Sequence, residues 1–355
     1  MPRRQRYIFA EEPRRGHGFL IGLLMVLLLA AAGLIVWNFA MNHSVAYTKQ
    51  YVTITRLPEA LENFTILHLS DLNGATIGDK QSAVEKAVES KSPSCIVLSG
   101  NMVGKAGDVQ PVLDLVAVLP KNTPILLLPG EDDPSLYATT AHASLSPYAD
   151  WAQRLQEAGV TILDEPVCIT RSKSKIWFVP EYLYSLNLED TRMAYQNQIN
   201  ALNAVVGDLT ADQAAQKRNA EYQVARMDRI SQTVSTITTS DIQVAVSHMP
   251  LTREYVIAAK ENTQDKYAFT MHHVSLVLAG GYCAGQWRLP GAGAIWVPEM
   301  GFFPDENLIS GLNYLSGVWQ YISPGLGVSE MYPLLPLRMF NSPDATLLVL
   351  SSSVH

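Results

Sequence analysis

The sequence predicts an α/β protein joined to a single membrane helix, and three observations support this prediction. Short apolar runs of four to six residues alternate with helix-like stretches and end in glycine or polar loops, as strands buried on both faces of a sheet do. The chain of 355 residues is long enough for one large domain of roughly 250–300 residues besides an anchor. Residues 19–41 carry no charge.

The uncharged segment 19–41 has the length of a membrane anchor. Its 23 residues would form a helix of about 34 Å, enough to cross a hydrocarbon core of ~30 Å. Five arginines precede it, which predicts that residues 1–18 are cytoplasmic and that the rest lies outside the cytoplasm. A cleaved signal peptide is the alternative, but the apolar stretch is too long and no small-x-small site follows it.

The net charge argues against nucleic-acid binding, and the cysteine content argues against a disulfide-stabilised fold. The net charge is -7, and because residues 1–17 contribute +3, the remainder carries -10. An acidic domain of this kind is not expected to bind nucleic acid or anionic headgroups through bulk charge. Cys95, Cys168 and Cys283 do not form a disulfide framework, and Cys95 lies in an apolar run typical of a core strand.

A connector over 42–63 is expected to lead into a domain covering 64–355. Helices are predicted around 83–90, 109–118 and 148–158. Strands are predicted at 64–69, 95–98, 125–128, 175–179, 242–246, 274–278, 294–297 and 346–350. Loops at the carboxyl ends of such strands are where α/β sheets usually hold their chemistry.

A helical hairpin is predicted to interrupt this alternation between about 188 and 237. The segment has no proline, and Tyr195, Ile199, Leu202 and Val206 recur at helical spacing along one face. Thr210 and Gln213 read as a capping box that opens the second helix. Packing against the domain and a role as an arm that binds a protein partner or a second copy are both open.

Five loops that follow predicted strands carry the candidate chemistry. They read S-D-L-N-G at 70–74, S-G-N-M-V at 99–103, P-G-E-D-D at 129–133, S-H-M-P at 247–250 and G-G-Y-C-A-G-Q-W-R-L-P at 280–290. Their order resembles the D-x-H, G-D-x-x-D, G-N-H-[DE], S-H-x-P and G-H-x-H-G-G-Q-x-R-L-P loops of calcineurin-like metallophosphoesterases of the membrane-anchored bacterial type. The stretches Y-I-S-P-G-L-G at 321–327 and P-L-R-M-F-N-S-P at 336–343 resemble the closing motifs of that family.

The resemblance implies a four-layer α/β/β/α sandwich over about 50–350 and a metal site at its strand ends. In such enzymes two divalent cations polarise a phosphate and activate a bridging water for in-line attack. That chemistry requires oxygen and imidazole ligands and one carboxylate shared by both metals. If this chain hydrolyses anything, the resemblance implies a phosphoester or pyrophosphate of a cell-envelope molecule.

The chain departs from the family pattern at most of the ligand positions. Asp71 and His248 keep their identities, and Glu131 stands where the family has asparagine but still offers oxygen ligands. Substituted residues occupy the other ligand positions, namely Asn73 for histidine, Asn101 for the bridging aspartate, Gly281 for histidine and Cys283 for histidine. Asp132 replaces the catalytic histidine, and its ionised carboxylate would repel a phosphate.

These departures predict a catalytically degenerate protein that acts as a binding or scaffolding module. The alternative is a phosphohydrolase with a reworked, mononuclear site for Mn, Mg, Ca or Zn, in which Asp71, Glu131 and His248 hold the cation with Asp132 and Asp133 nearby. A misaligned loop is the third interpretation. The candidates that it would require, His68, His142, His272 and His273, are better explained as a sheet residue and as loop or capping residues.

Overall fold

The computed structural model describes residues 18–141, 145–261, 269–329, 331–332 and 337–353. The chain divides into two compact units, residues 1–40 and 41–355, which are treated separately below. Most of the predicted cytoplasmic segment 1–18 and His142 lie outside the described residues.

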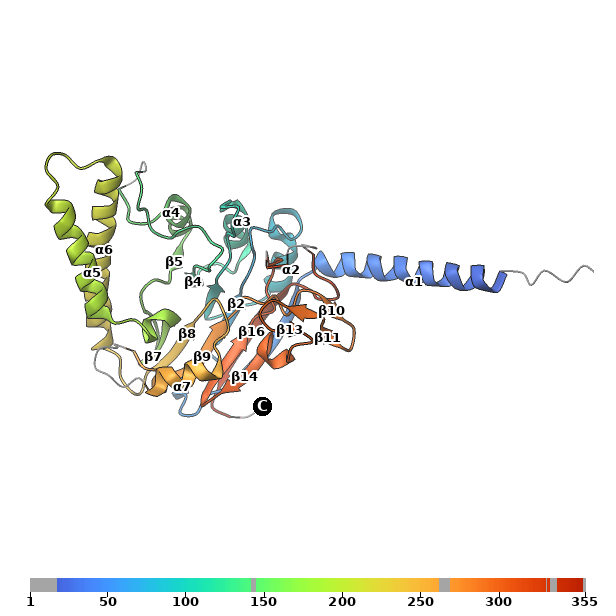
Figure 1. The fold of residues 1–355 in the computed structure, drawn as a ribbon. Helices are drawn as coiled ribbons and strands as arrows, with labels where there is room; N and C mark the ends of the chain where they lie inside the picture. The colour runs from blue at the N-terminus through green and yellow to red at the C-terminus, as the bar shows by residue number, and fades with distance from the viewer. Residues whose placement is uncertain (1–17, 142–144, 262–268, 330, 333–336, 354–355) are drawn as a thin grey trace, which may run out of the picture. The chain divides into compact units, whose positions relative to one another are not determined.

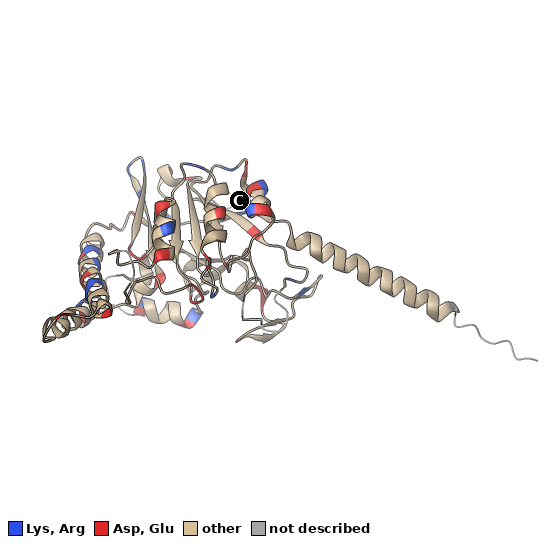
Figure 2. Ribbon diagram, turned by 90° about the horizontal axis from the view of Figure 1, so that it is seen from above, with Lys and Arg blue, Asp and Glu red and all other residues tan. Residues whose placement is uncertain are grey.

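The helix predicted over 19–41 is confirmed as α1, which covers Gly18–Asn42. Within it, 19–42 is long and apolar enough to cross a membrane, a property that anchors and signal sequences share. Figure 2 shows α1 without any lysine, arginine, aspartate or glutamate.

Two mixed sheets of six strands each form the larger unit (Figure 1). The first sheet has the order β1-β16-β2-β3-β4-β5 and the second has the order β14-β15-β9-β8-β7-β6. The strands of the first are β1 (Ala46–Thr53), β16 (Asp344–Ser351), β2 (Thr65–Leu69), β3 (Cys95–Ser99), β4 (Ile125–Leu128) and β5 (Val160–Ile162). Those of the second are β14 (Gly311–Leu315), β15 (Val318–Ile322), β9 (Val274–Ala279), β8 (Ile242–Val246), β7 (Ser174–Pro180) and β6 (Val167–Arg171).

Three apolar cores separate the predicted four layers of an α/β/β/α sandwich. The first core lies between the first sheet and the helices α2 (Ser82–Val88), α3 (Gln110–Val118) and α4 (Asp150–Glu157). A second core, which includes Ile66, Phe178 and Leu276, fills the space between the two sheets. The third packs the second sheet against α6 (Ala211–Val234) and α7 (Arg253–Glu261). Both sheets are therefore buried on two faces, which explains their continuous apolar strands.

Residues within the predicted connector 42–63 form part of the first sheet. β1 pairs in parallel with β16, and β16 pairs antiparallel with β2, so the chain enters the sandwich near residue 46. The alternation of exposed and half-buried residues in β1 is that of an edge strand, which the search for continuous apolar runs could not detect. The single strand predicted at 294–297 is replaced by two short ribbons, β10–β11 (Arg288–Leu289 with Gly293–Ala294) and β12–β13 (Trp296–Val297 with Gly301–Phe302).

The helices α5 (Leu188–Asn203) and α6 lie side by side between β7 and β8 in the chain (Figure 1). Thr210 and Gln213 form the predicted capping box at the start of α6. Met227 and Ile230 of α6 join the third core, so the hairpin packs on the domain. Val206 does not extend the buried stripe, because α5 ends at Asn203 and Val206 is fully exposed.

Candidate functional site at the strand ends

The five loops meet at one edge of the sandwich because β2, β3 and β4 are parallel in one sheet and β8 and β9 are parallel in the other. Backbone hydrogen bonds connect them. The amide of Asp71 donates to the carbonyl of Gly100 at 3.1 Å, and the amide of Gly280 donates to the carbonyl of His248 at 2.8 Å. The site is therefore fixed by main-chain contacts in addition to side chains.

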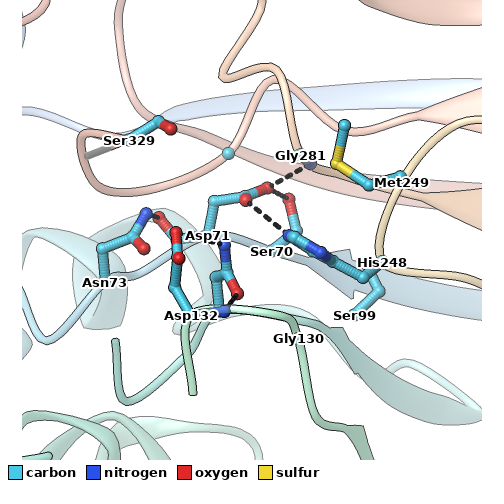
Figure 3. Close-up of polar contacts among 12 residues, drawn as sticks. Ser70, Asp71, Asn73, Ser99, Gly130, Asp132, His248, Met249, Gly281 and Ser329 are labelled. Carbon is cyan, nitrogen blue, oxygen red and sulfur yellow. Dashed lines mark hydrogen bonds and ion pairs between the residues drawn. The ribbon is translucent and has the colours of Figure 1, made fainter. Parts of the chain in front are cut away.

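Asp71 is the fully buried centre of the site (Figure 3). Its Oδ2 accepts hydrogen bonds from the Ser70 hydroxyl at 2.6 Å and from the Gly281 amide at 2.8 Å. Its Oδ1 lies 3.5 Å from Nε2 of His248, too far for a normal N–H···O hydrogen bond. One carboxylate oxygen is thus satisfied by the protein, and the other faces the imidazole.

The charge state of His248 is set by this carboxylate. Burial by itself would lower the pKa of His248, but Asp71, supported by Glu131 and Asp133, outweighs that effect and raises the pKa above its usual value. The nearby carboxylates therefore shift the ring of His248 toward its protonated form. Metal binding would require the neutral form of the ring.

Asn101, in the loop after β3, is hydrogen-bonded to Asp132, in the loop after β4. Oδ1 of Asn101 accepts from the Asp132 amide at 2.9 Å, and Nδ2 of Asn101 donates to the Asp132 carboxylate at 3.3 Å. The other Asp132 oxygen is paired with Lys105 at 3.1 Å. Both residues are thus engaged in a contact between loops. Where the resemblance implies a bridging carboxylate, the chain has the neutral amide of Asn101, which is already hydrogen-bonded to Asp132.

The two other acidic residues of the 129–133 loop have different surroundings. Asp133 accepts hydrogen bonds from the amides of Gly130, Met102, Val103 and Gly104, at 2.7–3.3 Å, and fastens its loop to the one after β3. Glu131 is exposed and near enough to His248 to raise its pKa. The structure therefore assigns Asp133 to the scaffold and leaves Glu131 free to face solvent or a ligand.

Met249 fills the space beside Gly281. A Cβ added at Gly281 would lie 2.4 Å from Sδ of Met249, and the φ of Gly281 is +93°, which disfavours other residues. An imidazole at this position, which the resemblance implies, would require Met249 to move. Cys283 lies buried nearby, and burial, followed by the charge of Asp71, raises the pKa of its thiol to about 12.

Four site residues adopt positive φ angles, namely Asp71, Asn73, Asn101 and Cys283, at +49° to +52°. This left-handed conformation costs most side chains roughly 1–2 kcal/mol, although aspartate and asparagine tolerate it better than others. Asn73 and Asn101 therefore preserve the turns although they change the ligand chemistry. The loops thus combine a demanding backbone conformation with neutral side chains at Asn73 and Asn101.

The side chains present do not fit a dinuclear metal centre. Among the residues with described positions, no three histidine, cysteine, aspartate or glutamate side chains are grouped so that they could hold an ion. Asp71 and His248 are adjacent, but neither Asn101 nor Gly281 supplies a charged or imidazole ligand to complete a pair of sites. Four buried atoms of these residues lack a hydrogen-bond partner, namely Oδ1 of Asp71, Oδ1 of Asn73, and Nδ1 and Nε2 of His248.

Comparisons with known proteins give the following. No protein-family model matches the sequence, and none of the curated proteins is similar to it. Two solved structures have a similar arrangement. One is a phosphopantetheinyl hydrolase from Mycobacterium tuberculosis, with 15% identity and a TM-score of 0.34 over 74% of this chain and 89% of that one. The other is a dimetal phosphatase from Danio rerio, with 10% identity and a TM-score of 0.34 over 75% of this chain and 88% of that one.

Three residues shape the site although sequence reasoning gave them no role of this kind. Ser70 satisfies Asp71, Met249 fills the space at Gly281, and Asp133 joins two loops. Ser70 and Met249 lie beside matched motif positions but have no charged or ligating group that would single them out. His272 and His273 are exposed in a short turn directly before β9, and His68 is a sheet residue whose ring is hydrogen-bonded to Ser99.

Proposed function

We propose that this protein is a membrane-anchored, extracytoplasmic metallophosphoesterase-like module that binds a ligand or partner and does not carry out two-metal phosphoester hydrolysis. The observation that carries the proposal is the pairing of Asn101 with Asp132. Two adjacent cations repel each other unless a negative ligand lies between them, and a neutral amide that is already hydrogen-bonded cannot fill that role.

Two further contacts support this proposal. His248, with its raised pKa, compensates Asp71 electrostatically, and Met249 occupies the space next to Gly281. Asp71 therefore has a counter-charge within the protein, although its Oδ1 and both ring nitrogens of His248 make no hydrogen bond. The charge-free α1 helix supports a membrane anchor, and the five preceding arginines favour a cytoplasmic N-terminus. The α5–α6 hairpin is the feature that we assign to ligand or partner recognition.

Hydrolysis assays with the full chain in detergent or lipid nanodiscs test this proposal. We expect no turnover of p-nitrophenyl phosphate or bis-p-nitrophenyl phosphate above buffer with Mn²⁺, Mg²⁺, Ca²⁺ or Zn²⁺, and no difference between the wild type and Asp71→Ala. Turnover that is abolished by Asp71→Ala but kept in a surface variant such as Glu254→Gln would overturn the proposal.

The unpartnered atoms favour one second candidate, a phosphohydrolase with a single cation. Oδ1 of Asp71 and Nε2 of His248 are buried, 3.5 Å apart and without hydrogen bonds, as groups that share one ion or water would be. Exposed Glu131 is close enough to His248 to raise its pKa, but it would have to move to supply a third ligand, because the described positions do not group these three side chains around an ion. One equivalent of Mn, Mg, Ca or Zn that is lost in Glu131→Gln would establish this candidate in place of the binding module.

A further inference from the structure

A cavity of about 620 Å³ lies next to the candidate site. Its walls come from the loops after β4 and β8, the end of β7, the helical hairpin and α7. His248, Met249 and Glu131 form the wall that it shares with the candidate site. A volume of roughly 300–1,000 Å³ is typical of sites for small molecules. The hairpin inserted between β7 and β8 closes the side of this cavity through Tyr195 and Gln223.

The one arginine that borders the cavity is already neutralised. Arg226 of α6 is buried, lies 3.6 Å from the Asp164 carboxylate, and also donates to the backbone carbonyl of Asp164 and to Tyr182. The Asp164 carboxylate in turn accepts from the hydroxyls of Tyr137, Tyr148 and Tyr222 at 2.9–3.1 Å. This network is complete within the protein, so it offers no free positive charge to an anionic ligand.

His248 in the cavity wall faces Asp71, and the remaining charged groups of the wall without an ion pair are carboxylates. Glu181, directly after β7, is partly buried and lines the cavity, and none of the described lysine, arginine or histidine side chains pairs with it. Its burial raises the pKa of its carboxyl group, which is the response of an acid that lacks a compensating cation. Glu131 adds a second carboxylate at the other side of the cavity.

Unpartnered polar and aromatic groups surround Glu181. The Tyr255 hydroxyl is buried and faces Glu181 without a hydrogen bond of normal geometry. Nε2 of Gln223, a residue only 1% exposed, also lacks a partner and lies in the cavity wall. Buried polar atoms of this kind normally find a partner. The Tyr255 oxygen can accept a hydrogen bond from an ammonium N–H, whereas Nε2 of Gln223 can only donate and does not favour a cation. Tyr195 presents another aromatic ring from α5.

We propose that this cavity binds a small organic cation, a primary or quaternary ammonium group attached to an apolar body. Glu181 would pair with the ammonium group, and Tyr195 and Tyr255 would supply ring faces, which attract cations through their negative quadrupole. Leu128, Leu163 and Val246 would contact the apolar body. The inference rests on the proposed binding function, and it names the ligand class that this function would serve.

Three probes of matched size and different charge test the inference. The full chain in lipid nanodiscs is titrated calorimetrically with phenethylammonium, 2-phenylethanol and 3-phenylpropionate in metal-free buffer, and titrations of empty nanodiscs are subtracted. We expect the cation to bind about tenfold or more tightly than the neutral probe, because one carboxylate–ammonium pair shielded from water accounts for the difference. The anion should not bind. Equal binding of the cation and the alcohol, preference for the anion, or no binding of the cation would overturn the inference.

Variants at the cavity wall assign the effect to named residues. Glu181→Gln should weaken phenethylammonium binding about tenfold, whereas Glu254→Gln, which removes the same charge from an exposed position of α7, should leave it unchanged. Tyr195→Ala should weaken it about fivefold, and Tyr195→Phe should restore it, because the ring face and not the hydroxyl is required. Unchanged affinity in Glu181→Gln, with native circular dichroism, would overturn the assignment.

The outcome is separable from that of the hydrolysis assay. Absence of charge selectivity in the titrations overturns the cation site and leaves the proposed binding function to another ligand. Metal-dependent turnover in the hydrolysis assay overturns the proposed function, whatever the probes show.

Discussion

Asn101 combines a backbone conformation that suits its turn with a side chain that carries no charge. Its left-handed backbone, at φ +49°, suits asparagine and aspartate alike, so the turn after β3 does not depend on the charge. The amide, however, donates to Asp132 and accepts from its backbone, which a carboxylate could not do in both directions.

Asn101→Asp should therefore destabilise the protein by about 1–3 kcal/mol at neutral pH, because it places a second carboxylate against Asp132 at a buried position. Chemical denaturation of the larger unit, residues 41–355, in the full chain measures this. Asn122→Asp, at φ +60° in an exposed turn, is the matched control and should change the free energy of unfolding by less than about 0.5 kcal/mol. An Asn101→Asp variant as stable as the wild type would contradict the assigned contact.

Gly281→His should destabilise the protein by about 2 kcal/mol or more beyond the same change at Gly159. Both glycines have similar φ angles, +93° and +90°, so the strain of the backbone is common to the two variants. At Gly281 the new Cβ also overlaps Met249, whereas Gly159 has open space. Adding Met249→Ala to Gly281→His should recover part of the loss. Equal destabilisation at the two glycines would show that Met249 does not fill this space.

For single residues, the sequence predicts which side chains lie at the site better than it predicts what each of them contacts. The matched motifs correctly place Asp71, Asn73, Asn101 and His248 at adjoining strand ends. The use of Asp133 as a link between loops was not predictable, because four backbone amides of different segments converge on it only in the folded chain.

Among the elements, α6 connects the inserted hairpin to the sandwich through Arg226. Arg226→Met should destabilise the protein by about 3–5 kcal/mol, because it leaves the buried Asp164 without its cation and the Asp164 carbonyl without its donor. Arg229→Met, one turn away, removes a surface pair with Glu165 and should cost less than about 1 kcal/mol. Thermal unfolding compares the two variants, and similar losses would argue against a buried anchor in α6.

Burial decides which elements the sequence reveals. Strands such as β3, β4 and β8 are apolar on both faces and were predicted nearly to the residue. The edge strands β1, β6 and β14 and the short strand β5 were missed, because partial exposure or a length of three residues leaves no continuous apolar run. The inner strand β15 was also missed, because Gln320 interrupts its apolar residues.

For the whole molecule, His68 and His248 make the free energy of unfolding depend on pH in opposite directions. Burial, opposed in part by Asp71, lowers the pKa of His68 to about 3, so below pH 6.5 the unfolded chain binds a proton that the folded chain does not. His248, with a raised pKa, adds stability below pH 6.5 that is lost as the pH rises through its folded pKa.

Between pH 7.5 and pH 5 the wild type should lose about 2 kcal/mol of its free energy of unfolding through His68, because the slope is about 1.4 kcal/mol per pH unit below pH 6.5. His68→Gln should not show this loss, so its free energy of unfolding should rise by about 2 kcal/mol relative to the wild type over this range. Denaturation at both pH values measures the gain. His272→Gln, at an exposed position, should show none. Parallel pH profiles for His68→Gln and the wild type would mean that His68 titrates normally.

Elemental analysis of the purified full-length protein tests the central claim most directly, because the pairing of Asn101 with Asp132 and the missing side chain at Gly281 leave no pair of cation sites. Protein prepared without chelators and with Mn, Fe, Zn, Mg and Ca supplied should contain none of these metals in stoichiometric amount. One or two ions per chain, retained through dialysis and absent from Asp71→Ala, would contradict the account.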